Sequence, residues 1–216
     1  MNIIIMGPPA AGKGTQAEMI SVAYPIPHIS TGEMFREEVT NQTSIGKQAQ
    51  PYMDAGQLVP DQITIGIVAE RLAMPDCEAG FLMDGYPRTI LQAQALDEIL
   101  AKLGRRVELV VNLVVPNEVL LARVVGRVNC IKCKNVYNAR SNSTKIAGIC
   151  DKCGGELVQR SDDNEETAQN RLQVYIDQAE PLLKYYEDKG ILVSLDGDRK
   201  PLTVFAEIVR ELNKIR

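Results

Sequence analysis

The sequence has no long hydrophobic run and no excess of positive charge. No uninterrupted apolar stretch approaches the roughly 20 residues that span a bilayer, so we expect no membrane association. The net charge is −4 at pH 7 and aromatic residues make up 5% of the chain, which argues against a nucleic-acid binder. No internal repeat or low-complexity tract is visible. What remains is the composition of a soluble globular protein, with 45% apolar and 24% charged residues.

A chain of 216 residues fits one core domain with insertions, and two small domains are also compatible with this length. The N-terminus is predicted to be a strand rather than a signal peptide, so a cytoplasmic location is expected.

The N-terminal segment carries the strongest functional signal. An apolar, β-branched run at 2–6 predicts a buried strand, and a helix-forming segment begins at Thr15. Between them lies G-P-P-A-A-G-K-G-T, residues 7–15, the pattern of a phosphate-binding loop. Gly7, Gly12 and Gly14 would supply the conformations that aim backbone N–H groups at a phosphate, and Lys13 would add a full positive charge.

In this loop Gly14 follows the lysine, where the general pattern has Ser or Thr. G-K-G-T-Q is typical of small nucleoside monophosphate kinases. The alternative, a glycine-rich turn without a ligand, fits poorly with a preceding strand and a lysine together.

Further strands are predicted at 25–29, 81–84, 107–115 and 190–195. A helical segment is predicted from 30 or 31 to about 55, with a break near 43–44. Three further helices are predicted to begin at capping residues: Asp61 for a helix to 73, Thr89 for a helix to 103, and Asn117 for the next one. The last two helices are predicted to begin at 161 and at Leu202. Residues 30–59 are therefore interpreted as a helical insertion. Alternating strands and helices predict a parallel α/β sheet with right-handed crossovers.

The strand at 81–84 ends in Asp84, and G-Y-P-R-T follows at once. A carboxylate at the end of a parallel strand faces the ligand crevice, where it can hold Mg²⁺ directly or through water. The alternative is a plain strand followed by a turn.

Four cysteines form two pairs with C-x-x-C spacing, Cys130 with Cys133 and Cys150 with Cys153. Two such turns can bring four thiolates to one tetrahedral metal, and a fully occupied ligand set indicates a structural site. Zn²⁺ is the first choice, and mononuclear iron is an alternative. Two disulfides, or a zinc ribbon that binds nucleic acid, fit a cytoplasmic and acidic chain less well. The fifth cysteine, Cys77, is expected to have no role.

Arginines lie near the ends of many predicted elements. A reaction between two anions must offset much negative charge, and planar guanidinium groups suit phosphate. His28 is the single histidine, which fits an acceptor that is already an anion and needs no general base.

Taken in order, these motifs resemble bacterial adenylate kinase of the long form with a zinc-bearing lid. The similarity rests on residues 7–16, H-I-S-T-G-E-M-F-R at 28–36, G-Q-L-V-P-D at 56–61, D-G-Y-P-R-T at 84–89, the cysteine quartet, and Q-R-S-D-D-N-E-E-T at 159–167. The resemblance implies a three-layer α/β/α core with a five-stranded parallel sheet, formed by 1–29, 60–125 and 164–216. It also implies an AMP-binding insertion at 30–59 and a zinc-bearing lid at 126–163.

The resemblance also implies the site residues. ATP would contact Ala10, Ala11, Gly12, Lys13, Gly14, Thr15, Arg127, Val136, Tyr137 and Arg199. AMP would contact Thr31, Arg36, Gln57, Leu58, Val59, Gly85, Tyr86, Pro87, Arg88, Gln92, Arg160 and Arg171. The catalytic set would be Lys13, Asp84, Arg88, Arg123, Arg127, Arg160 and Arg171.

This chain departs from the family pattern in three places. Ala10 stands where a glycine is usual and should fit only if its dihedral angles are ordinary; Asn138 replaces a common histidine; and residues 141–145 replace a proline-rich stretch.

The implied reaction is ATP + AMP = 2 ADP, with Mg²⁺ bound to ATP, structural Zn²⁺, and a monomeric enzyme. A kinase for another monophosphate such as UMP or CMP, and a non-catalytic zinc-and-nucleotide sensor, are the alternatives.

Overall fold

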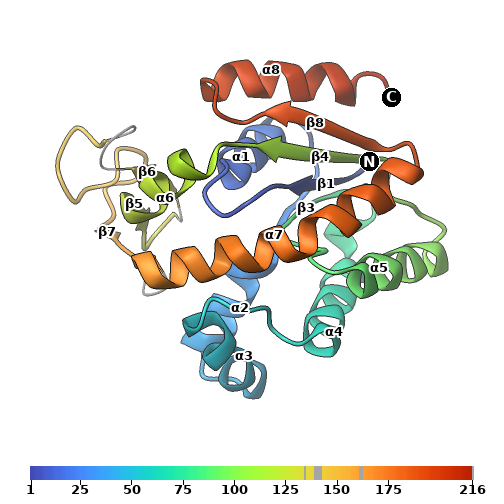
Figure 1. The fold of residues 1–216 in the computed structure, drawn as a ribbon, viewed down its shortest axis with the longest axis horizontal. Coiled ribbons are helices and arrows are strands. Elements are labelled where there is room, and N and C mark those ends of the chain that lie inside the picture. Colours follow the sequence, from blue (N-terminus) through green and yellow to red (C-terminus); the bar gives the residue numbers. More distant parts are fainter. Residues whose placement is uncertain (134, 139–142, 161–162, 216) are drawn as a thin grey trace.

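A central parallel sheet organises the chain. The computed structural model describes residues 1–133, 135–138, 143–160 and 163–215 (Figure 1). Five strands pair in parallel in the order β2-β3-β1-β4-β8. Their bounds are β1 Asn2–Met6, β2 His28–Ser30, β3 Phe81–Asp84, β4 Leu109–Val114 and β8 Leu192–Asp196. The predicted five-stranded parallel sheet is confirmed.

Helices cover both faces of this sheet, because successive side chains of a strand point to opposite faces and both sides of β1 are apolar. Ile3 and Ile5 pack in one cluster with α1 Lys13–Ala23, α6 Asn117–Val125 and α8 Pro201–Leu212. Ile4 and Met6 pack in the other with α4 Asp61–Leu72, α5 Ile90–Lys102 and α7 Glu165–Asp188. The three-layer α/β/α core is confirmed (Figure 1).

Two helices form a protrusion on one side of the sheet. They are α2 Thr31–Thr40 and α3 Ser44–Asp54, and the Thr43 side chain caps α3 by accepting a hydrogen bond from the Gly46 N–H. The expected break near 43–44 is confirmed. In Figure 1 they lie below the sheet, under the N-terminal half of α7.

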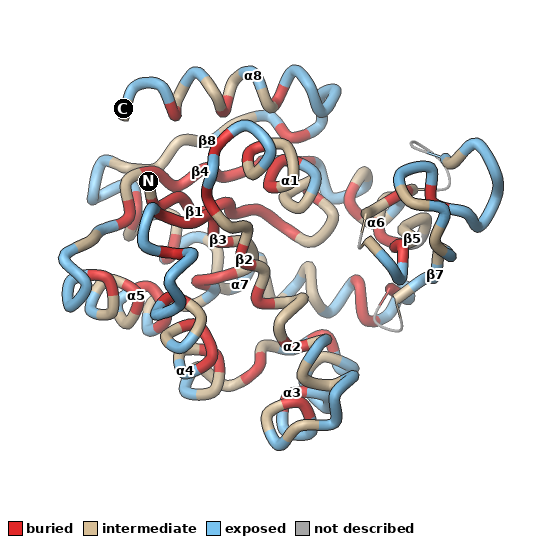
Figure 2. The backbone as a smooth tube through the Cα atoms, turned by 180° about the vertical axis from the view of Figure 1, so that it is seen from behind, coloured by how far each residue is buried: buried red, intermediate tan, exposed pale blue. Residues whose placement is uncertain are grey.

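A second sheet carries the cysteines. It is antiparallel, with β5 Arg127–Cys130 between β6 Val136–Asn138 and β7 Leu157–Val158. Figure 2 shows this region at the far end of the molecule, mostly exposed or half-buried, whereas the central strands are buried. No helix within the described residues is both long enough and apolar enough to cross a bilayer.

The structure differs from the expected boundaries at several helix starts. Asp61 and Asn117 do not cap α4 and α6, because Pro60 and Pro116 occupy the cap positions. Asp61 instead lies in the first turn, where a helix dipole favours a carboxylate. The last long helix begins at Glu165, capped by the Asn164 side chain, and residues 161–162 of the expected start lie outside the described part of the chain. Thr89 caps α5 as predicted.

Candidate active site

The phosphate-loop sequence forms a tight turn between β1 and α1. Gly7 and Gly12 have φ angles of 140° and 97°, in the region that favours glycine. A Cβ at Gly7 would lie 2.8 Å from the Leu113 carbonyl oxygen, so space excludes a side chain as well. Gly14, by contrast, lies in the first turn of α1 and has no positive φ, so the conformational role expected for it is wrong. Its Cβ position would be 4.0 Å from the Asp84 Oδ2, which places that carboxylate beside the loop.

Ala10 does not have ordinary dihedral angles. Its φ is 64°, a left-handed conformation that costs an L-residue about 1–2 kcal/mol relative to glycine. Ala10 therefore does not meet the condition of ordinary dihedral angles under which it was expected to replace the usual glycine. The loop keeps its shape at the cost of local strain.

Lys13 folds back over the loop. Its Nζ donates hydrogen bonds to the carbonyl oxygens of Gly7 at 2.7 Å and Pro8 at 2.8 Å. Burial lowers the pKa of Lys13 to about 8; Asp84 opposes this effect, and the charges of Arg88, Arg171 and Arg127 add to it. A lysine whose charge is costly to bury is stabilised by a bound anion.

Asp84 lies at the end of β3 and faces His28 at the start of β2, with 3.4 Å between Oδ2 and Nε2. Burial would raise the pKa of Asp84, but the His28 contact and the Lys13 charge outweigh it and lower that pKa. Burial likewise opposes a charged His28, yet the Asp84 contact raises the pKa of His28. The Asp84 carboxylate thus stays ionised next to the phosphate loop, a fitting environment for a divalent cation.

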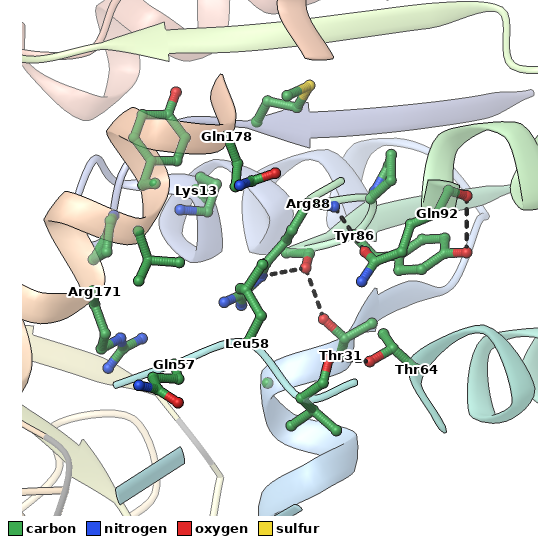
Figure 3. A pocket seen from close by; sticks show the side chains of 18 of the residues that line it. Lys13, Thr31, Gln57, Leu58, Thr64, Tyr86, Arg88, Gln92, Arg171 and Gln178 are labelled. Carbon is green, nitrogen blue, oxygen red and sulfur yellow. Dashed lines mark hydrogen bonds between the residues drawn. The ribbon is translucent and has the colours of Figure 1, made fainter. Parts of the chain in front are cut away.

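A cavity opens beside Lys13 and is enclosed by α2, the α3–α4 connection, the β3–α5 loop and α7 (Figure 3). Its walls include Lys13 and nearly all the side chains expected at an AMP site, namely Thr31, Arg36, Gln57, Leu58, Val59, Gly85, Tyr86, Pro87, Arg88, Gln92 and Arg171. Arg160, the remaining member of that set, does not line it. Residues from five separate stretches of sequence thus converge on one cavity.

The cavity has two chemically distinct ends. In Figure 3 Lys13, Arg88 and Arg171 lie on one side, and Tyr86, Thr64 and Gln92 lie on the other. Cations at one end suit a phosphate, and a buried amide with apolar neighbours at the other suits a base.

The β3–α5 loop holds this arrangement rigidly. Thr31 Oγ1 donates to the Gly85 carbonyl oxygen at 2.9 Å, and Arg88 Nε donates to the same oxygen at 2.7 Å. The Tyr86 hydroxyl donates to the Gln92 carbonyl oxygen at 3.0 Å. The peptide bond between Tyr86 and Pro87 is cis.

Other expected arginines pair with carboxylates near the loop, and Arg127 shares one of these carboxylates with Arg171. Arg127 Nε donates to Asp163 Oδ2 at 2.7 Å, and Arg171 Nη1 lies 3.8 Å from Asp163 Oδ1. Arg123 Nη2 donates to Asp198 Oδ1 at 2.6 Å and Nη1 approaches the Gly197 carbonyl oxygen, while Gly197 itself packs against Ala11. Arg199 is exposed and pairs with Asp196 and Glu207.

Two acidic residues at the site have contacts that the sequence interpretation missed. The Asp163 side chain is fully buried between Arg127 and Arg171. Asp61 accepts a hydrogen bond from Gln92 Nε2 at 2.7 Å. Asp163 lies in an acidic run attributed to a helix start, and Asp61 was expected to be a helix cap, so neither had a sequence signal of its own.

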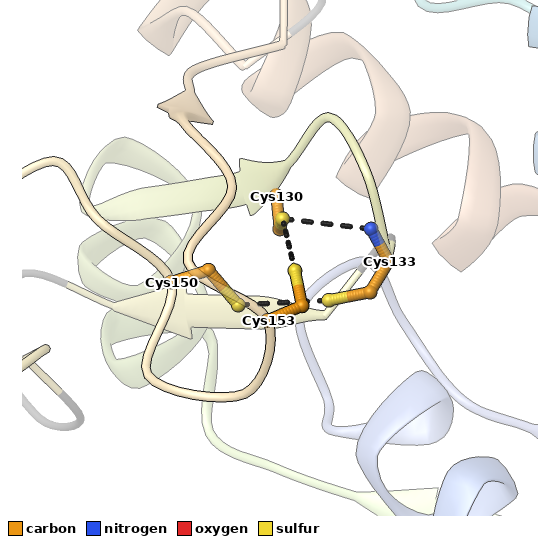
Figure 4. A group of neighbouring side chains, drawn as sticks. All are labelled: Cys130, Cys133, Cys150 and Cys153. Atoms are coloured by element: carbon orange, nitrogen blue, oxygen red, sulfur yellow. Dashed lines mark hydrogen bonds between the residues drawn. The ribbon is translucent and has the colours of Figure 1, made fainter.

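The four cysteines come together at the second sheet (Figure 4). The Sγ atoms of Cys130, Cys133, Cys150 and Cys153 all lie within 4.8 Å of one another, and all five cysteines of the chain are free thiols. Tetrahedral zinc with bonds of about 2.3 Å needs sulfur atoms slightly under 4 Å apart, so this donor set fits the ion. The disulfide alternative does not hold.

Tyr137 is buried in the same cluster, and its hydroxyl lies 3.4 Å from Cys150 Sγ. Its ring therefore supports the cysteines, and Val136 beside it is half-buried. Asn138 donates to the Arg123 carbonyl oxygen at 2.9 Å, which ties the lid to α6.

A phosphate loop on the first strand of a parallel sheet, with an acid at the end of the adjacent strand, defines a P-loop nucleotide-binding protein. A family model described as adenylate kinase matches residues 5–191. Similar chains are named adenylate kinase in Syntrophomonas wolfei, 54% identical over 100% of both chains, in Geobacillus sp. strain WCH70, 53% identical over 98% of both, and in Archaeoglobus fulgidus, 51% identical over 100% of both. The chain belongs to the adenylate kinase family. It is a phosphotransferase for the reaction ATP + AMP = 2 ADP.

Proposed function

We propose that the cavity of Figure 3 binds AMP and that the phosphate loop binds the phosphates of ATP, so that Lys13 lies between the two nucleotides. The observation that carries this proposal is the shared position of Lys13, which is part of the loop and also of the cavity wall. The γ-phosphoryl group would leave the β-phosphate oxygen of ATP and bond to a phosphate oxygen of AMP, giving two ADP molecules.

The cationic residues offset the negative charge of the transferring group. Lys13, Arg88 and Arg171 are already at the cavity. Arg123, Arg127 and Arg160 would join them when residues 126–163 close over the site as a lid and 30–59 close as an AMP-binding insertion. Closure also keeps water, a competing acceptor, away from the phosphoryl group. In this scheme Val136, Tyr137 and Arg199 contact ATP chiefly through their main chain, because the Tyr137 and Arg199 side chains have other partners.

Members of this family use Mg²⁺ with ATP. Asp84 would hold this ion through water, since its carboxylate is buried beside the loop and its pKa is lowered despite that burial. The bound ion neutralises phosphate charge.

Zinc would occupy the four-cysteine site and act structurally, because four thiolates leave no open coordination position. We further propose a monomeric cytoplasmic enzyme whose partners are ATP, AMP and ADP, without a nucleic-acid or membrane partner; the acidic net charge of −4 supports this.

A comparison of AMP, CMP, UMP and GMP as acceptors at equal concentration tests the substrate assignment. We expect AMP to be used best, and a preference for a pyrimidine nucleotide would overturn the assignment. One bisubstrate analogue, two adenosines joined by five phosphates, should bind per chain. ATP binding without turnover in the presence of Mg²⁺ and AMP would instead support the sensor alternative.

Lys13→Met tests the proposed role of Lys13 between the two nucleotides. Turnover should fall about 10²–10³-fold, as on removal of a group that stabilises transition-state charge, while the circular dichroism spectrum is retained. A near-normal rate would refute the role of Lys13.

A further inference from the structure

Gln92 is held at both ends of its side-chain amide. It lies in the first turn of α5, is 1% exposed and lines the cavity. Its Oε1 accepts a hydrogen bond from the Arg88 backbone N–H at 2.8 Å, and its Nε2 donates to Asp61 Oδ1 at 2.7 Å. The two contacts come from different elements, the β3–α5 loop and the first turn of α4.

These two partners permit only one orientation of the amide. A backbone N–H can only donate and an ionised carboxylate can only accept. If the amide were reversed, its N–H₂ group would face the Arg88 N–H and its oxygen would face the Asp61 carboxylate. Both contacts would be repulsive, and both lie in a partly buried environment.

The Asp61 carboxylate is itself fixed. Its second oxygen, Oδ2, accepts a hydrogen bond from Thr89 Oγ1 at 3.1 Å, and the same hydroxyl oxygen accepts from the Gln92 backbone N–H at 3.2 Å as the cap of α5. Asp61 therefore joins the start of α4 to the start of α5, and it cannot rotate away from Gln92 without breaking the Thr89 contact. Figure 3 shows Gln92 beside Tyr86, at the end of the cavity away from Lys13 and Arg171.

An amide has two donor hydrogens and two acceptor lone pairs. Arg88 and Asp61 use one of each, so one donor and one acceptor are left for a ligand in the cavity. The edge of a 6-amino purine offers an acceptor at N1 and a donor at the amino group, whereas a 6-oxo purine offers a donor at N1 and an acceptor at O6. Simple reversal of the amide would convert a site for the first into a site for the second.

We propose that Asp61 is a positioning residue that locks the Gln92 amide in one orientation and so favours a 6-amino purine monophosphate over a 6-oxo purine monophosphate. The inference rests on the proposed binding of AMP in this cavity. Asp61 would not touch the nucleotide and would act through Gln92.

The test compares AMP with IMP, which differ at this edge alone, as acceptors for wild type and Asp61→Asn. An asparagine side chain can both donate and accept, so the variant removes the restraint that Asp61 places on a reversed Gln92, leaves the one from the Arg88 N–H, and keeps the volume at position 61. We expect the ratio of kcat/KM for AMP to that for IMP to fall about tenfold, a conservative value for a hydrogen bond to a charged group. The Tm and the KM for ATP should stay close to wild type. Asp188→Asn, an exposed change at the end of α7, is the matched control and should leave the ratio unchanged.

Gln92→Ala separates this inference from the proposal on which it depends. Suppose that Gln92→Ala raises the KM for AMP while Asp61→Asn leaves the ratio of kcat/KM for AMP to kcat/KM for IMP unchanged. In that case the positioning role of Asp61 is wrong and the assignment of AMP to this cavity stands. If Gln92→Ala leaves the KM for AMP unchanged, the assignment of AMP to this cavity is wrong.

A measurement on the unaltered enzyme removes any dependence on how Asp61→Asn folds. The side-chain N–H₂ signals of Gln92, assigned by their loss in Gln92→Ala, should show one proton that exchanges slowly with solvent because Asp61 accepts it. If both protons exchanged as fast as in a free glutamine, the proposal that Asp61 holds the Gln92 amide in one orientation would be wrong.

Discussion

The helical protrusion of α2 and α3 and the cysteine-bearing segment of β5, β6 and β7 both lie outside the central sheet, yet they are stabilised differently. The protrusion shares the main hydrophobic cluster, which includes Phe35, Ala49 and Val59 together with Ile4 and Met83 of the sheet. It is also tied to α7, because Thr167 Oγ1 donates to the Asp54 carbonyl oxygen at 3.3 Å.

The cysteine-bearing segment has its own cluster. Among its described residues, Cys130, Tyr137 and Cys150 are the buried hydrophobic members. So few apolar side chains cannot offset the entropy of ordering a small sheet, and the proposed zinc ion on the four thiolates would act as a staple instead. The protrusion therefore continues an existing core, whereas the cysteine-bearing segment depends on its own small cluster.

The largest expected effect follows from Cys130→Ser, which breaks the staple. Hydrogen-exchange protection of the lid amides should fall by roughly a thousandfold or more, since the metal supplies the folding free energy of such a unit. Protection in the protrusion should not change. Tm should fall, with a smaller loss of turnover at moderate temperature, and a chelator should have no additional effect on the variant.

Cys77→Ser is the matched control for this variant. Cys77 is a fully buried thiol of the core and lies outside the metal cluster. It should leave metal content and lid protection at the wild-type level. An inactive Cys130→Ser enzyme with unchanged stability would contradict a structural metal.

Phe35→Ala should act on the protrusion and the core together. Phe35 is 5% exposed within the shared cluster, and loss of its ring should lower the free energy of unfolding by about 3–5 kcal/mol in urea titrations. A chelator should not add to this loss. Tyr52→Ala, at an aromatic residue of the same protrusion that is 37% exposed, should cost little. Separate unfolding of 30–59 with the core transition unshifted would refute the shared core.

Asp163→Asn should weaken the base of the lid. The substitution removes the charge that pairs with Arg127, whose side chain is 13% exposed, and we expect a loss of about 3 kcal/mol in unfolding free energy. A triphosphate should restore much of this loss, because its oxygens can replace the carboxylate. An equal loss of unfolding free energy with and without ATP would show that Arg127 does not contact the nucleotide. Asp151→Asn, on the exposed side of the lid, is the control.

The smallest effect is expected at the contact between lid and core. Lys152, from the second cysteine turn, forms an ion pair with Glu18 of α1, and both side chains are largely exposed. Pairs of this kind contribute about 0.2–1 kcal/mol and are screened by salt. Lys152→Met should weaken ATP binding about twofold at low salt and not at all in 1 M salt. A double-mutant cycle with Glu18→Gln isolates the pair, and a coupling that persists at high salt would exclude a simple surface ion pair.

The local elements of this chain follow from local chemistry. Apolar runs such as 81–84 gave strands, Thr89 capped α5, and the C-x-x-C spacings predicted a cluster that the structure confirms, because these signals act over a few residues. Gly7 and Gly12 were recognisable for the same reason, since the turn itself demands their φ angles.

The sequence alone determined the parallel α/β class, the phosphate loop and the cluster of four cysteines. Only the tertiary structure decided that Asp61 contacts Gln92, that Asp163 is buried against Arg127, and that Tyr137 turns toward Cys150. Ala10 belongs to the same group, since its positive φ is imposed by the loop around it. The reason is that a carboxylate or a hydroxyl has no preferred long-range partner in the sequence; its role depends on which helix ends and loops the packed core brings next to it.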